Sequence, residues 1–108
     1  MDIDDWRRQL RTFAVQRHWE QFHTPKNLAM ALSVEASELQ EIFQWLTPEQ
    51  SFQVMSGQRA CDVEDEVADV MIYLLRLVDI LGIDLERVVA AKISRNASRF
   101  PPRGLSPS

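Results

Sequence analysis

The sequence predicts an all-α protein, and three observations carry that prediction. The 108 residues include only 3 Gly and 5 Pro, too few turn residues for a sandwich or barrel of short strands. Long stretches without either residue alternate with short punctuated segments, as expected for helices joined by links. Apolar residues make up 45% of the chain, and its length suits one core. We therefore expect one four-helix-bundle-like domain over residues 1–102, with a flexible tail at 103–108.

Start signals mark the first two helices. Asp4 or Asp5 can cap a helix that runs to about residue 19. A threonine N-cap at Thr24 and a proline at the first helical position, Pro25, predict a second helix that ends near residue 46.

The second half of the chain is divided in the same way. A Thr-Pro-Glu-Gln sequence with a capping-box glutamine predicts a short connecting helix over 48–55. No Gly or Pro interrupts residues 59–81, and Gly82 supplies the stop of a long helix. Asp84 then caps a last helix over 85–99, which two prolines end.

Charge and cysteine content exclude several classes of function. The net charge of −4 opposes binding to a phosphate backbone, so we expect no polymeric nucleic-acid partner. Cys61 is the single cysteine, which excludes an intrachain disulfide or a thiolate metal cluster and favours a reducing, cytoplasmic location. No run approaches the roughly 20 apolar residues of a membrane span, so no membrane partner is expected.

The helix predicted over 59–81 is apolar on nearly every side. A helix with this pattern is buried on every side, and one short chain cannot cover it. The sequence therefore predicts that the molecule associates with copies of itself as a homo-oligomer. One stripe consists of Val63, Val67, Val70, Leu74, Leu77 and Leu81, while Ile72, Leu75 and Ile80 lie elsewhere on the circumference.

Carboxylates interrupt the apolar faces of two predicted helices. Glu35 and Glu38 lie three residues apart on the second helix, and Glu66 and Asp69 repeat the spacing on the long helix after it. Packing these helices together would bring four acids into a small volume, which is costly without a compensating cation. Oxygen ligands without His or Cys favour Mg²⁺, with Mn²⁺ as a substitute. The alternative is that these are ordinary surface acids.

These motifs resemble a known family. The segments Glu35-Ala36-Ser37-Glu38-Leu39 and Asp65-Glu66-Val67-Ala68-Asp69-Val70 are similar to the Glu-x-x-Glu and Glu-x-x-Asp signature of the all-α MazG-type nucleoside triphosphate pyrophosphohydrolases. Residues 18–28 and 43–45, with Tyr73 and the segment from Lys92 to Pro101, resemble the dCTP pyrophosphatase branch. The resemblance covers roughly residues 3–102.

The resemblance implies a Mg²⁺-dependent enzyme that cleaves a nucleoside triphosphate between its α and β phosphates, giving the monophosphate and pyrophosphate. It implies a dimer or dimer of dimers with active sites near subunit interfaces. Glu35 or Glu38 would be the general base. The implied metal ligands are Glu35, Glu38, Glu66 and Asp69, the nucleotide contacts are Trp19, Glu20, Gln21, Phe22, His23, Trp45 and Tyr73, and the phosphate or sugar contacts are Lys92 and Asn96.

The sequence leaves the substrate and several residue roles open. Leu10 stands where some relatives carry a histidine that holds the nucleotide, so the preference for dCTP or a modified dCTP is open. The same chemistry on another nucleotide, including phosphoribosyl-ATP, is one rival. A non-catalytic helical dimerisation module is another. For Trp19, Trp45 and Tyr73 the alternative role is core packing.

Overall fold

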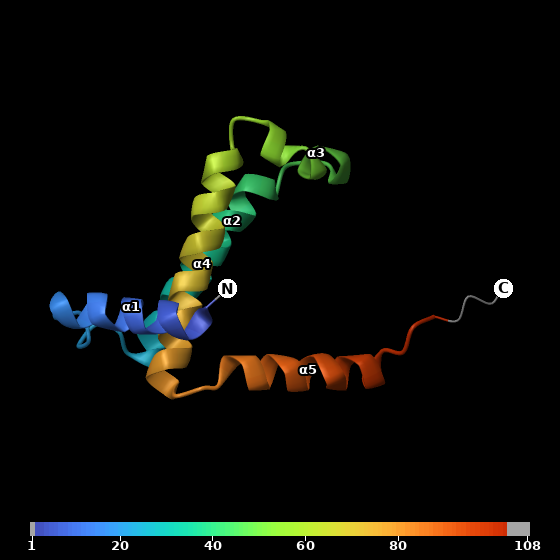
Figure 1. Ribbon diagram of the computed structural model, residues 1–108. Helices are drawn as coiled ribbons and strands as arrows, with labels where there is room; N and C mark the ends of the chain where they lie inside the picture. The colour runs from blue at the N-terminus through green and yellow to red at the C-terminus, as the bar shows by residue number, and fades with distance from the viewer. Residues whose placement is uncertain (1, 104–108) are drawn as a thin grey trace.

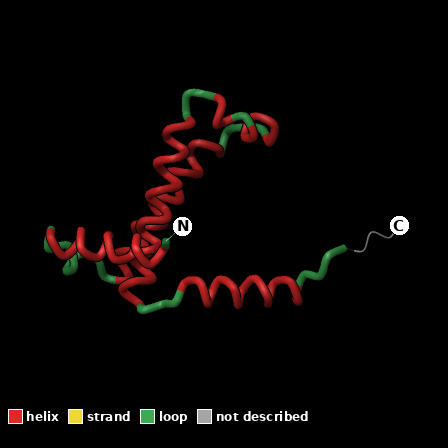
Figure 2. The backbone as a smooth tube through the Cα atoms, in the orientation of Figure 1, coloured by secondary structure: helices red, strands yellow, loops and turns green. Residues whose placement is uncertain are grey.

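The computed structural model describes residues 2–103, which fold into helices without a strand (Figures 1 and 2). The all-α prediction is confirmed for this part of the chain. The predicted tail lies outside the described residues from 104 onward. The elements are α1 (Ile3–Gln16), α2 (Pro25–Phe43), α3 (Pro48–Phe52), a 3₁₀ turn η1 (Val54–Ser56), α4 (Ala60–Leu81) and α5 (Leu85–Arg99).

Helices α2 and α4 lie side by side and antiparallel, and they build most of the core (Figure 1). Helix α1 crosses α4 near its C-terminal half (Figure 1). The two largest fully buried side chains are Leu28 of α2 and Leu75 of α4. The other buried apolar residues are Ala14, Ile42, Val63 and Val78.

Most helix starts follow the predicted caps. Thr24 accepts a hydrogen bond from the Asn27 amide, and Asp84 accepts one from the Arg87 amide. A complete capping box at Thr47 opens α3. Gly82, with φ of +65°, adopts the left-handed conformation that ends α4.

The ends of α1 and α2 differ from the prediction. Asp2, rather than Asp4 or Asp5, caps α1, because its carboxylate accepts the Asp5 amide at 2.9 Å. Helix α1 stops at residue 16 instead of 19, since His18 has φ of +56° and cannot continue a right-handed helix. Helix α2 ends at residue 43 instead of 46, because the Leu46 amide donates at 2.9 Å to the carbonyl of Phe43, three residues back, and so leaves the α-helical i−4 pattern.

The chain is elongated. Its radius of gyration is 17.8 Å, larger than the about 13 Å of a compact domain of this size. Helix α5 projects away from the α2–α4 pair (Figure 1). On α4, Val67 is 52% exposed and Leu81 is 51% exposed, so one chain leaves part of this apolar helix uncovered. Among residues 2–103, no helix is long and apolar enough to cross a membrane.

Candidate active site

Three of the four predicted metal ligands converge between α2 and α4. Glu35 and Glu38 extend from α2 and Glu66 from α4, and one carboxylate oxygen of each lies within 4.8 Å of the others. Asp69, half-buried and one turn further along α4, lies outside this group. The i, i+3 spacing on two antiparallel helices therefore produces a cluster to which α4 contributes Glu66 and not Asp69.

The cluster lacks a compensating partner among the described residues. Glu35 Oε2 and Glu66 Oε2 are buried, and neither has a hydrogen-bond partner. Burial, followed by the neighbouring carboxylates of Glu66 and Glu38, raises the pKa of Glu35 to about 7. Burial also raises the pKa of Glu66. Unpartnered buried carboxylates are costly, and oxygen ligands of this type suit a hard divalent cation, so the residues present fit Mg²⁺ or Mn²⁺.

A pocket of about 350 Å³ opens beside the cluster. Glu38 and Glu66 line it, together with further acids. Arg59 is the basic residue in its lining, and its Nε lies 2.6 Å from a carboxylate oxygen of Asp62. A triphosphate entering this pocket would meet a surplus of negative charge, so its binding requires an added cation.

The link between α1 and α2 carries an aromatic group next to the C-terminal half of α4. Trp19 packs edge-on against Phe13, with 5.4 Å between ring centroids, and lies 5.8 Å from the His23 ring. Trp19 is 41% exposed, which leaves ring surface for a planar ligand. The neighbouring predicted contacts Glu20, Gln21 and Phe22 are exposed.

His23 is tied to α4. Its Nδ1 accepts a hydrogen bond of 3.3 Å from Nε of Arg76. Partial burial, with the positive charge of Arg76 as a second cause, lowers the pKa of His23. Tyr73 is half-buried on α4, between Asp69 and Arg76 in sequence.

The single chain does not bring the remaining predicted contacts together with Trp19 and His23. Trp45 is 87% exposed and follows the C-terminal end of α2. It is separated from the Trp19 end by a helix of 19 residues, which is about 28 Å long. Lys92 and Asn96 are exposed on α5, which projects away from the α2–α4 pair (Figure 1).

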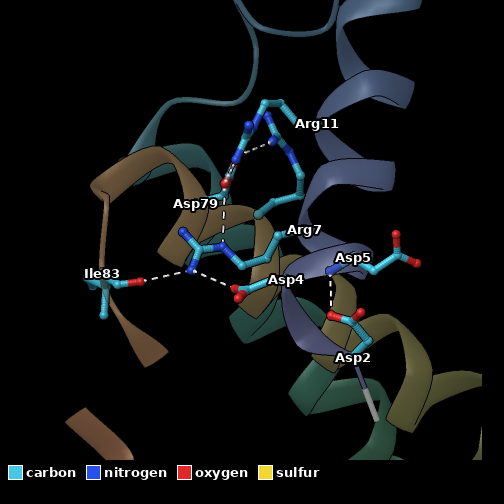
Figure 3. Close-up of polar contacts among 8 residues, drawn as sticks. Asp2, Asp4, Asp5, Arg7, Arg11, Asp79 and Ile83 are labelled. Atoms are coloured by element: carbon cyan, nitrogen blue, oxygen red, sulfur yellow. Dashed lines mark hydrogen bonds and ion pairs between the residues drawn. The ribbon is translucent and has the colours of Figure 1, made fainter. Parts of the chain in front are cut away.

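Sequence reasoning missed a group of charged residues where α1 crosses α4. Asp79 of α4 accepts hydrogen bonds from Arg11, whose Nε lies 2.9 Å from Oδ2 of Asp79 (Figure 3). Nε of Arg7 lies 3.4 Å from Oδ1 of the same carboxylate (Figure 3). Arg76 also lies 3.3 Å from Asp79. The available signal was the charged pair Arg76 and Asp79 within the apolar run 74–81.

Comparison with known proteins identifies the class. The sequence model of the MazG-like family matches residues 30–103, so the chain belongs to the MazG-like family. The chain is also 40% identical over 100 residues to dCTP pyrophosphatase 1 of Rattus norvegicus, a protein of the branch that the motifs resemble.

Two further relatives are also pyrophosphatases by name. The chain is 41% identical to dCTP pyrophosphatase 1 of Homo sapiens, and the match covers 92% of the chain and 59% of that protein. The chain thus spans about three fifths of the length of the curated relatives it matches. The crystal structure of a pyrophosphatase from Archaeoglobus fulgidus superposes with a TM-score of 0.81 and 44% identity, over 86% of each chain.

Proposed function

We propose that this chain is a Mg²⁺-dependent pyrophosphohydrolase that cleaves dCTP or a modified dCTP between the α and β phosphates. The products are the nucleoside monophosphate and pyrophosphate. The observation that carries this proposal is the pair of buried, unpartnered oxygens, Glu35 Oε2 and Glu66 Oε2, in a carboxylate cluster beside an open pocket. The relatives, named dCTP pyrophosphatase and pyrophosphatase, support the reaction and the substrate class.

The carboxylates have distinct roles in this proposal. Glu35, Glu38 and Glu66 hold the cation. Asp69 lies outside this group, but its charge acts on Glu35 and Glu66, and we propose that it completes the set of ligands. When bound, Mg²⁺ neutralises phosphate oxygens and makes the phosphorus accessible to water. Glu38 is exposed and lines the pocket, whereas Glu35 lies deeper between the helices. Glu38 is therefore the better placed to accept a proton from the attacking water, and Glu35 is the alternative.

The nucleotide is held by the α1–α2 link and by residues supplied from another copy. Trp19 offers a stacking surface, and His23 offers a polar contact beside it. Trp45, Lys92 and Asn96 lie away from Trp19 and His23 of their own chain (Figure 1), so we propose that they complete the nucleotide site of a neighbouring subunit in a homodimer or dimer of dimers. The exposed apolar residues of α4 support this association. The lone cysteine supports a cytoplasmic location.

A panel of nucleotides assayed with Mg²⁺ tests this proposal, with products identified by ³¹P NMR. We expect pyrophosphate and dCMP from dCTP, and loss of at least 100-fold in turnover for Glu38→Gln. Glu64→Gln is the matched control, because Glu64 is an exposed glutamate of α4 that does not belong to the carboxylate cluster. Turnover of phosphoribosyl-ATP or another nucleotide instead of dCTP would support the same chemistry on a different substrate. Absence of turnover with every nucleotide would favour a non-catalytic helical dimerisation module.

A further inference from the structure

Arg76 is a buried cation in the apolar half of α4. Its side chain is 4% exposed, and its Nη1 lies 3.3 Å from Oδ2 of Asp79, which is itself 6% exposed. Its Nε donates to Nδ1 of His23, a residue 53 positions away in sequence. A guanidinium at this depth is stable only when its donors are paired, so its orientation is fixed by these two partners.

Asp79 is itself held from several directions. Arg11 bonds both of its carboxylate oxygens, and Arg7 approaches it with Nε at 3.4 Å (Figure 3). Arg7 also donates to the carbonyl oxygen of Ile83, after the end of α4, at 3.1 Å (Figure 3). The position of Arg76 is thus set by α1, α4 and the start of the link to α5.

The direction of the hydrogen bond determines which nitrogen of His23 carries the proton. A guanidinium has donors and no acceptor, and it stays protonated in proteins. Nδ1 of His23 must therefore be the unprotonated acceptor, which places the proton of the neutral ring on Nε2. Charging the ring would protonate Nδ1 and bring two cations together, so this contact favours the neutral form.

We propose that Arg76 is a positioning residue that holds His23 in the Nε2–H tautomer and presents this N–H to an oxygen of the nucleotide. The inference rests on the proposed function to the extent that His23 contacts the nucleotide. Trp19 lies beside the His23 ring. The donor is therefore presented next to the surface on which the base stacks. The opposite tautomer would turn a lone pair toward the nucleotide oxygen and repel it.

Nitrogen-15 NMR of the free protein tests the tautomer without any assay of activity. In the wild type we expect Nδ1 of His23 unprotonated and Nε2 protonated at neutral pH, with exposed His18 as the internal reference. Arg76→Met should give a mixture of tautomers. Asp79 keeps Arg7 and Arg11 in this variant, which supports folding. Arg11→Met leaves Asp79 paired with Arg7 and Arg76 and does not touch His23, so it should leave the His23 signals unchanged.

Two NMR results would overturn the proposal. One is a protonated Nδ1 in the wild type, which needs no variant to fold. The other is a His23 spectrum in folded Arg76→Met identical to that of the wild type. An enzyme inactive on all nucleotides would instead contradict the proposed function and leave the tautomer measurement standing.

Kinetics supply the second readout. Loss of one oriented hydrogen bond should raise KM for the nucleotide about 2- to 12-fold in Arg76→Met, with kcat little changed. Arg11→Met should match the wild type. Deoxycytidine and inorganic triphosphate, used as competitive inhibitors, identify the oxygen that His23 contacts. Weaker inhibition of Arg76→Met by deoxycytidine assigns the contact to the base, and weaker inhibition by triphosphate assigns it to the phosphates. An unchanged KM together with unchanged inhibition by both would contradict the inference.

Discussion

Replacing Glu35 with glutamine tests whether the carboxylate cluster is a metal site. Each of the three glutamates offers one oxygen within 4.8 Å of the others, and Oε2 of Glu35 is buried without a partner. In Glu35→Gln the cation loses one charged ligand while the shape of the side chain is kept. Removing even an outer-shell partner weakens metal affinity roughly 10- to 100-fold, so we take about 100-fold for a direct ligand.

The expected size of the stabilisation by Mg²⁺ follows from the linkage between metal binding and folding. At free Mg²⁺ about 100 times Kd, a cation that binds only the folded state stabilises it by about 2.7 kcal/mol. For a domain of this size that is a rise in Tm of roughly 10–20 °C. At the same Mg²⁺ concentration, a 100-fold weaker site gives about 0.4 kcal/mol, or roughly 2–3 °C.

Thermal melting followed by circular dichroism, with Mg²⁺ or with EDTA, measures both values. The metal-free variant should melt at or above the wild-type temperature, because Oε2 of Glu35 is buried without a partner, which makes its charge unfavourable and raises its pKa. Glu64→Gln should keep the full Mg²⁺ response. The reasoning is refuted if Glu35→Gln responds to Mg²⁺ as strongly as the wild type does.

Three further predictions follow from the structure. Without metal, in EDTA, Glu35 of the folded protein keeps its proton up to a pKa of about 7, whereas the ordinary value is 4.5. The contribution of Glu35 to the free energy of unfolding should therefore fall as pH rises from 4.5 to about 7, and it should stay low at higher pH. Urea titrations across this range should show that decline and its reduction by Mg²⁺, and a rise caused by this group would contradict the assignment. Gly82→Ala should cost about 1–2 kcal/mol in urea denaturation, because φ is +65° and the added Cβ meets no atom within 4 Å, so the cost is that of the backbone alone; an unchanged midpoint would argue against the left-handed cap. Trp45→Ala and Glu38→Gln subunits, each nearly inactive alone, should recover activity when mixed and refolded together, since one of the two sites then has both residues intact; no recovery would place Trp45 outside a shared site.

Local signals explain what could be predicted of the fold. Thr24, Thr47 and Asp84 act on amides within three residues, so the sequence around each contains the whole interaction. The stop after residue 16 depends on the left-handed conformation of His18, a residue type that carries no strong signal for it. The direction of α5 was not predictable either, because a helix with no buried residue has few contacts in its own chain to encode its position.

The same distinction applies to the site. Glu35 and Glu66 were predictable because a charge within an apolar stripe is conspicuous in sequence. The convergence of only three acids depends on how α2 and α4 are aligned, which periodicity does not determine. The contact of Arg76 with His23 joins the α1–α2 link to α4 and is purely tertiary. Its only trace in sequence is a charge in the run 74–81, and nothing there indicates the partner.

Calorimetric titration of the protein with Mg²⁺ at low and high ionic strength tests the central claim most directly. Acids gathered between two helices should bind the ion at a defined stoichiometry, release protons near neutral pH because the pKa of Glu35 is about 7, and keep most of their affinity at high salt. Weak binding without proton release that disappears as salt is added would mean that these carboxylates are solvated surface groups, and the proposed hydrolase would lack its metal.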